Sequence, residues 1–213
     1  ETGSPIAFGG RRVNREDEPK YINSPETELF HKSKTLYGYH LARPAIQSHN
    51  KVIVVEGYTD VIACHQVGVT NVVATLGTAL TPEHADKLAR ICDEVILVFD
   101  GDEAGQRAAD RAVEVFFSKN IDVQICVLPE GKDPADMASD ASTLQQCFTN
   151  SVDAIAYKLG RLDATLQTTN TISGKAKRID TFIDELVRLG VANLSGIKKP
   201  LVYERIAAVI RLP

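Results

Sequence analysis

Two stretches of the sequence, VIVVEG at residues 52–57 and VILVFDGD at residues 95–102, decide the fold of the chain. Each begins as an apolar run of strand length and ends in acidic residues. The apolar runs barely alternate with polar residues, which is typical of strands covered on both faces in a parallel sheet. Glu56, Asp100 and Asp102 are therefore expected at the ends of buried strands.

The same pattern of strand followed by helix continues along the middle of the chain. Four apolar runs of strand length occur, at Val52–Val55, Val72–Leu76, Val95–Phe99 and Val123–Leu128. Helical stretches are expected between them, at Tyr58–Val67, Pro82–Cys92 and Glu103–Lys119, the second capped by Thr81. This alternation predicts an α/β fold with an open, largely parallel four-stranded sheet and helices on both faces. Ligands of such sheets bind beyond the carboxyl ends of the strands.

Both flanks of this module differ from it. Residues 1–50 contain turn formers and predict a short α+β segment of hairpin and loop, with a short helix near Lys34–Ala42. Residues 51–140 form the α/β module. Residues 141–213 predict a helical subdomain, in which Ile179–Leu189 carries an apolar stripe. The interpretation is three units with boundaries near residues 50 and 140.

Charge is distributed unevenly over these 213 residues, whose net charge is −4. Lys and Arg against Asp and Glu number 7 and 6 in residues 1–50, 7 and 16 in 51–140, and 10 and 6 in 141–213, giving +1, −9 and +4. An acidic centre between more basic flanks fits a cation site beside phosphate-binding surfaces; the alternative is a solvated acidic surface.

The four cysteines are far apart and are expected to be reduced. With no secretory signal or apolar span, a cytoplasmic protein is expected.

Acidic residues follow three of the four predicted strands. Glu56 follows the first, Asp100 and Asp102 the third, and Asp133 the fourth. Clustered carboxylates repel one another, so protons or cations must offset the repulsion, and an oxygen-only set favours Mg²⁺ or Mn²⁺. The chemistry indicated is phosphoryl or nucleotidyl transfer. For Glu56 or Asp60 alone, a helix cap is the competing interpretation.

Several ordered motifs resemble a known family. VIVVEGYTD at residues 52–60 together with VFDGDEAG at 98–105 is similar to the Toprim signature of primases, topoisomerases and some nucleases. PKYINSPET at 19–27, with FHK at 30–32 and LYG at 36–38, resembles the segment before the Toprim module in bacterial DnaG-type DNA primases. FGGR at 8–11 and LGTALT at 76–81 are further matches. The resemblance covers most of the chain and weakens after about Asp140.

The resemblance implies a metal-dependent enzyme that builds RNA primers from ribonucleoside triphosphates on single-stranded DNA. It implies that Glu56, Asp100, Asp102 and Asp133 hold the metals and that the first three are catalytic, with Glu56 a candidate for proton transfer. A nucleic-acid and nucleotide track is implied at Arg11, Lys20, Asn23 and Lys32. The RNA primer, and for the full-length protein the replicative helicase through a region absent here, are the implied partners.

The sequence departs from the family in two ways. The last acidic motif commonly reads Asp-Pro-Asp, whereas Asp133-Pro134 is followed here by Ala135 and then Asp136. A metal role for Asp136 is therefore in doubt. The family's zinc module, the first part of its polymerase domain and its helicase-binding region have no counterpart in these residues.

Other functions use the same acidic set. A Toprim-type nuclease would share the acids but not the Asn-Ser-Pro-Glu-Thr segment at 23–27. A topoisomerase needs a nucleophilic tyrosine, and nothing in the sequence singles one out. A noncatalytic module that organises partners on DNA is the alternative from a different class, and retention of the acids argues against it.

Overall fold

The fold was examined in a computed structural model of the chain. It describes residues 3–14, 16, 18–19, 21–99, 103–117, 119, 121–129, 132–138, 141–194 and 196–210. For residues 103, 104 and 193 it describes the backbone alone.

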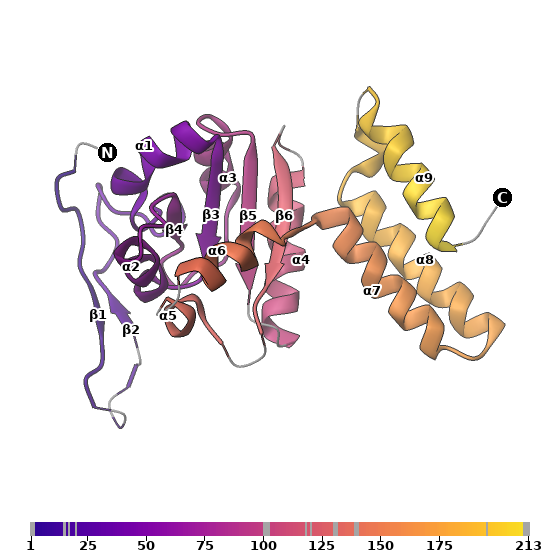
Figure 1. Ribbon diagram of the computed structural model, residues 1–213, viewed down its shortest axis with the longest axis horizontal. Coiled ribbons are helices and arrows are strands. Elements are labelled where there is room, and N and C mark those ends of the chain that lie inside the picture. Colours follow the sequence, from indigo (N-terminus) through magenta and orange to yellow (C-terminus); the bar gives the residue numbers. More distant parts are fainter. Residues whose placement is uncertain are drawn as a thin grey trace.

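A five-stranded sheet forms the centre of the molecule (Figure 1). The spatial order of its strands is β4 (Val72–Ala74), β3 (Lys51–Val55), β5 (Glu94–Phe99), β6 (Asp122–Val127) and β7 (Val152–Asp153). The first four are parallel, as predicted, and β7 pairs antiparallel with β6. The expectation of four strands was one short, because the two residues of β7 are too few to show a period in the sequence.

Helices cover both faces of this sheet, which confirms the predicted layering. Alternate strand residues point to opposite faces, so Val54 and Leu97 pack on one side while Val55 and Val98 pack on the other. The first side is covered by α1 (Tyr39–His49), α3 (Pro82–Ala89), α4 (Glu103–Phe117) and α7 (Ala154–Thr168). The second side is covered by α2 (Tyr58–Gln66) and α6 (Ala141–Thr149).

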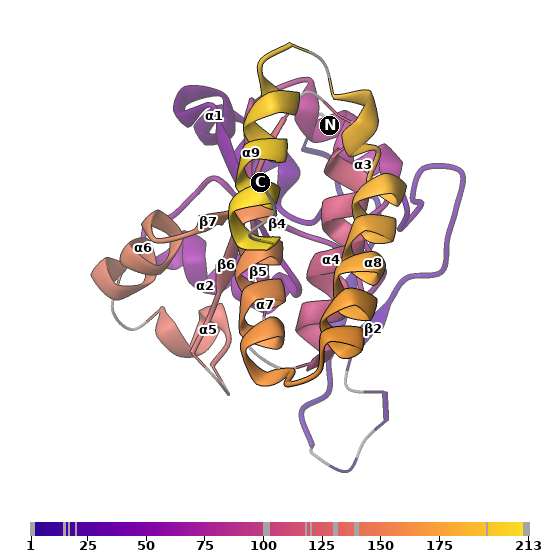
Figure 2. The same cartoon turned by 90° about the vertical axis from the view of Figure 1, so that its right-hand side faces the viewer.

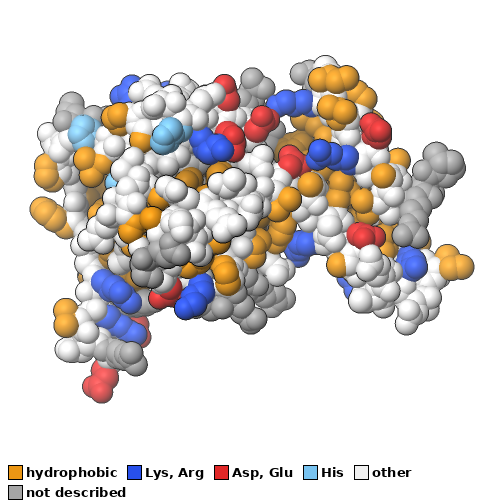
Figure 3. Space-filling view, in the orientation of Figure 1, with side chains coloured by type: hydrophobic (Ala, Val, Ile, Leu, Met, Phe, Trp, Pro, Cys, Tyr) orange, Lys and Arg blue, Asp and Glu red, His pale blue; other side chains and the backbone are white. Residues whose placement is uncertain are grey.

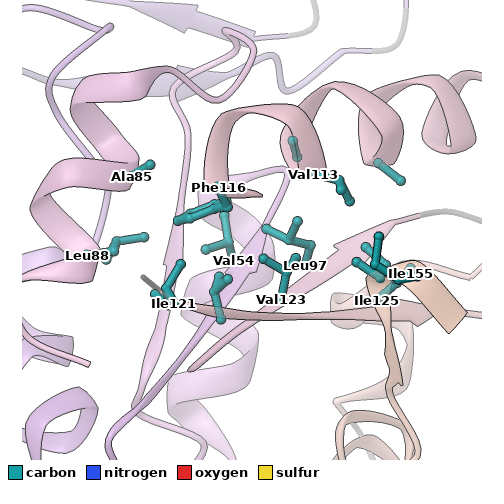
Figure 4. Packing of buried hydrophobic residues seen from close by; sticks show 14 of the residues in the cluster. Val54, Ala85, Leu88, Leu97, Val113, Phe116, Ile121, Val123, Ile125 and Ile155 are labelled. Atoms are coloured by element: carbon teal, nitrogen blue, oxygen red, sulfur yellow. The ribbon is translucent and has the colours of Figure 1, made fainter. Parts of the chain in front are cut away.

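The larger core lies between the sheet and α4. Phe116 is fully buried and points toward Val54 and the strands (Figure 4). The buried stripe of α4 consists of Ala109, Ala112, Val113 and Phe116. Ala108 and Val115 of the same helix are only partly buried.

The amino-terminal segment contains the predicted hairpin. Strand β1 (Gly9–Arg11) pairs antiparallel with β2 (Tyr21–Asn23). The helix expected near Lys34–Ala42 begins later, at Tyr39, and continues through Pro44 to His49. Gly38 sets its start, because its φ of 77° lies in the left-handed region that stops a helix extending backwards.

Three helices and a short 3₁₀ turn follow β7. They are α7, α8 (Ile172–Arg188), η1 (Val191–Asn193) and α9 (Lys198–Ile210), and they extend past the β7 edge of the sheet (Figures 1 and 2). Of the stripe predicted on α8, Phe182 and Leu186 are buried, whereas Ile183 and Val187 are 38% and 62% exposed. The space-filling view shows a notch between these helices and the sheet (Figure 3).

A cavity of about 510 Å³ lies where these helices meet the sheet. Ion pairs cross between the two parts, from Lys198 to Asp122 at 3.0 Å and from Arg205 to Asp153 at 3.2 Å.

All four cysteines are free, as expected. Within the described ranges, no helix is both long and apolar enough to cross a membrane.

Candidate active site

The predicted acidic rim lies at the carboxyl end of the sheet. Glu56 directly follows β3, and its side chain is exposed there. Asp133 follows β6 and precedes the short helix α5 (Pro134–Met137). Both residues line one cavity of about 290 Å³, together with Asn23 of β2. The chain thus brings two of the predicted metal ligands and one predicted nucleic-acid residue together.

Other predicted residues lie elsewhere. Asp100, Asp102 and Lys20 fall outside the described residues. Arg11 lies on β1 with its guanidinium 5.7 Å from the centre of the Tyr21 ring, and it does not line the cavity. Lys32 lies in the loop before α1, beside the start of α3. Within the described ranges, which do not include Asp100 and Asp102, no three His, Cys, Asp or Glu side chains lie close enough together to hold a metal ion.

Two acids of this region form a capping box at the start of one helix, α5. Asp133 Oδ1 accepts a hydrogen bond from the Asp136 amide at 2.7 Å, and Asp136 Oδ2 accepts one from the Asp133 amide at 3.3 Å. This reciprocal capping box turns the Asp136 carboxylate back toward the start of α5, and Asp136 does not line the cavity. The geometry gives Asp136 a structural role.

Asp60 caps a helix, which was the alternative interpretation of this residue from the sequence. Its Oδ2 accepts a 3.0 Å hydrogen bond from the Gly57 amide at the start of α2. The residue is 7% exposed and lines the same cavity as Glu56. The Asp60 carboxylate therefore both caps α2 and forms part of the cavity wall.

Aromatic residues missed by the sequence prediction wall the cavity. Tyr21 and Tyr58 meet edge to face with ring centroids 5.3 Å apart. The Tyr58 hydroxyl donates to the Gly10 carbonyl at 2.6 Å. Burial, followed by the neighbouring Tyr21 and Tyr37 hydroxyls, raises the pKa of Tyr58, so the phenol stays protonated and acts as a donor. The position of Tyr58 two residues after Glu56 was the available signal.

The hairpin approaches α2 closely enough to leave little room for a side chain at Gly9. A Cβ on Gly9 would lie 3.2 Å from both Asn23 Oδ1 and the Tyr58 ring. Asn23 Nδ2 donates to the Leu76 carbonyl at 3.1 Å, which joins the hairpin to the loop between β4 and α3. Thr75 and Gly77 of that loop also line the cavity, and their position after a parallel strand could have predicted this.

A second cavity of about 280 Å³ also borders Glu56. It is lined by Glu56, by the loop at residues 77–80 and by Arg111 of α4. The carboxylate of Glu56 therefore borders two hollows at the same sheet edge.

The parallel sheet with acids beyond its carboxyl edge defines a Toprim-like module, and the comparisons with known proteins agree. The family of Toprim-like modules matches residues 53–138, and the DNA primase catalytic core, N-terminal domain, matches residues 1–43. A DNA primase of Listeria innocua is 38% identical over 196 residues, which is 90% of this chain and 31% of that protein.

Solved structures extend the likeness to nearly the whole chain. A DNA primase domain from Pseudomonas aeruginosa is 36% identical with a TM-score of 0.83, covering 98% of this chain and 65% of that one. The RNA polymerase domain of Mycobacterium tuberculosis primase DnaG, in complex with a double-stranded DNA oligomer with a 6-nucleotide overhang, is 30% identical with a TM-score of 0.75, covering 98% and 67%. The chain belongs to the family of DnaG-type DNA primases. It spans less than half the length of the curated relatives it matches.

Proposed function

We propose that this chain is the metal-dependent catalytic core of a DNA primase, which synthesises short RNA primers on single-stranded DNA. In this reaction a nucleotide or primer 3′-hydroxyl attacks the α-phosphorus of a ribonucleoside triphosphate, and pyrophosphate leaves. Family membership and the acidic sheet edge support the proposal.

The observation that carries it is the shared cavity of Glu56, Asp133 and Asn23. The carboxylates of Glu56, directly after β3, and of Asp133, at the start of α5, line one space, to which the hairpin contributes Tyr21 and Asn23. A triphosphate entering this space would meet both the acids and the polar groups of the hairpin.

A divalent cation fits the donors of this cavity. Carboxylates line it, and among the described residues no histidine or cysteine does. Oxygen-only donors suit Mg²⁺ or Mn²⁺. We assign Glu56 and Asp133 as ligands, with Asp100 and Asp102 as further ligands from their sequence positions. Bound there, the metal would reduce the charge repulsion between the acids and the triphosphate and favour departure of pyrophosphate.

The template track is assigned to Arg11, Lys20, Asn23 and Lys32. Arginine and lysine neutralise backbone phosphates without reading sequence, as a primase that copies varied templates requires. The DNA complex of the M. tuberculosis relative supports a nucleic-acid partner for this chain. The RNA primer occupies the same track as product.

Three further assignments belong to the proposal. Residues 1–50 act as part of a polymerase subdomain, residues 51–140 as the catalytic module and residues 141–213 as a helical subdomain. The full-length protein has the replicative helicase as partner, and it works in the cytoplasm at the replication fork.

The test is incorporation of labelled ribonucleotides on single-stranded DNA. Wild type should yield template-dependent RNA in the presence of Mg²⁺ or Mn²⁺, and Asp100→Ala and Glu56→Gln should yield almost none. Glu94→Gln is the matched control, because Glu94 lies at the opposite end of β5, paired with Lys51 at 2.9 Å. Scission of the DNA would indicate a nuclease instead. Neither product from the full-length protein would indicate a noncatalytic module.

A further inference from the structure

The loop that carries Lys32 is fastened to the start of α3 by two side chains. Thr81 Oγ1 donates to the Ser33 carbonyl at 2.6 Å. His84 Nε2 lies 3.0 Å from the Lys32 carbonyl. Helix α3 begins at Pro82, after its cap Thr81, and the loop at residues 77–80 lines a cavity with Glu56. These hydrogen bonds therefore fix the backbone of Lys32 relative to the acidic sheet edge.

The protonation of His84 follows from its surroundings. Its Nδ1 accepts a hydrogen bond from the Thr81 amide at 3.3 Å, so the ring proton lies on Nε2 and is donated to Lys32 O. The side chain is 0% exposed. Burial lowers the pKa of His84 and keeps the ring neutral, which is the form that can accept on one nitrogen and donate from the other.

The rest of the loop is fixed as well. The Lys32 amide donates to Glu26 Oε1 at 3.0 Å, and Phe30 is only 2% exposed. By contrast, among the residues that the structure describes, none forms an ion pair with the Lys32 ammonium, and the side chain is half-buried. The backbone is held from both sides while the charged group stays available to an anion.

We propose that His84 is a positioning residue, which holds the Lys32 backbone so that the ammonium meets a phosphate of the DNA template beside the catalytic edge. This inference rests on the proposed function, since it takes the template as the anion. His84 touches neither template nor metal and acts through Lys32 alone.

Two substitutions distinguish the roles of the two ring nitrogens of His84. In His84→Asn the short amide can still accept from the Thr81 amide and so keeps the cap of α3, but it cannot reach Lys32. In His84→Gln the longer amide can place a donor near the position of Nε2 and so keeps the bond to Lys32. The matched control is His65→Asn, because His65 Nε2 makes a similar 3.1 Å contact, with the Val72 carbonyl.

The experiment measures the affinity of the full chain for a fluorescent single-stranded oligonucleotide over a range of salt concentrations. A lysine that neutralises one phosphate contributes about one to the slope of log affinity against log salt. Lys32→Ala should lose about one from this slope and His84→Asn should lose most of the same amount. His84→Gln and His65→Asn should keep the wild-type slope. In the Lys32→Ala background, His84→Asn should cause no further loss.

A merely structural role for His84 would reduce the folded fraction of each variant without changing the slope. The inference is overturned if Lys32→Ala lowers the slope and folded His84→Asn does not, or if the two losses add. Amide hydrogen exchange tests the tether without any DNA: residues 30–34 should exchange faster in His84→Asn than in His84→Gln, and equal rates would also overturn it. If wild type itself fails to bind DNA while the exchange result holds, the proposed function fails and the tether stands.

Discussion

The phenol of Tyr58 donates a 2.6 Å hydrogen bond to the carbonyl oxygen of Gly10 and so joins α2 to the hairpin. Tyr58 follows the first acidic residue of the site, and Gly10 lies next to Arg11 on β1. The bond therefore connects the predicted catalytic edge with the predicted template track.

Removing this hydroxyl should loosen the hairpin. Tyr58→Phe keeps the ring contacts with Tyr21 and Tyr37 but loses the hydrogen bond, and we expect a loss of about 1 kcal/mol in the free energy of unfolding. Hydrogen exchange at residues 9–11 and 21–23 should be faster than in wild type. Tyr203→Phe, at an exposed tyrosine of α9, is the control. Unchanged exchange in the hairpin would show that the bond does not hold it.

The carboxylates should bind divalent metal together. Glu56→Gln and Asp102→Asn should each weaken binding of Mn²⁺ by at least about tenfold, the lower range for disturbing a metal site. Titration calorimetry with Mn²⁺, and with Mg²⁺ in parallel, measures this. Glu94→Gln should bind as wild type does. Metal binding by Glu56→Gln equal to that of wild type would remove Glu56 from the ligand set.

An ion pair with a buried ammonium joins α4 to the helices that follow the sheet. Lys158 is 6% exposed and its ammonium lies 2.5 Å from Asp110 Oδ1, with Glu185 3.7 Å away. Asp110→Ala leaves a buried ammonium with the more distant Glu185 as its remaining acidic partner, and we expect a loss of about 3 kcal/mol in the free energy of unfolding. Urea denaturation measures it.

Asp163→Ala on α7 is the control for this ion pair, because the Asp163 carboxylate accepts from Gln167 on the exposed surface of the helix. It should cost less than about 0.5 kcal/mol. Equal losses in the two variants would mean that burial of Lys158 contributes nothing beyond a surface contact.

Protonation of His84 should lower the free energy of unfolding as the pH falls. Burial is the largest cause lowering the pKa of His84, and Lys87 lowers it further. Hydrogen bonds to the Lys32 and Thr35 backbone and the charge of Glu83 raise it. The folded state thus binds this proton less readily than the unfolded state, whose pKa is about 6.5. The stabilisation is complete above about pH 6.5 and is lost as the pH falls from there through the folded-state pKa.

Urea unfolding at a series of pH values checks this. His84→Asn should show a smaller decrease in the free energy of unfolding over the acidic range than wild type. A pH dependence unchanged by His84→Asn would assign the titration to other groups.

Much of the fold could be predicted from local pattern. The four parallel strands, the helices between them and the Thr81 cap, whose Oγ1 accepts from the His84 amide at 3.2 Å, were all predicted. Strand β7 and the course of α1 through Pro44 were not. Two residues are too short to show a period, and a proline within a helix is tolerated only when packing, here that of Ala42 and Ile46, compensates.

Part of the candidate site could likewise be predicted from the sequence, and part could not. Glu56 and Asp133 could be found because an acid that follows a buried parallel strand must emerge at one edge of the sheet. Capping by Asp136 could not be separated from metal binding, since both use a carboxylate near a helix start. The role of Tyr58 was missed because its partner, Gly10, is distant along the chain.

The sequence by itself determined the layered sheet, the edge at which its acids emerge and the family, because these depend on short periodic runs and contiguous motifs. Only the tertiary structure decided which side chains serve as ties between segments: Tyr58 to Gly10, His84 to Lys32 and Lys158 to Asp110. Each tie requires two distant segments to meet at hydrogen-bond distance in a partly buried setting. Nothing in the local pattern of either segment specifies that meeting, which results from how the whole chain packs.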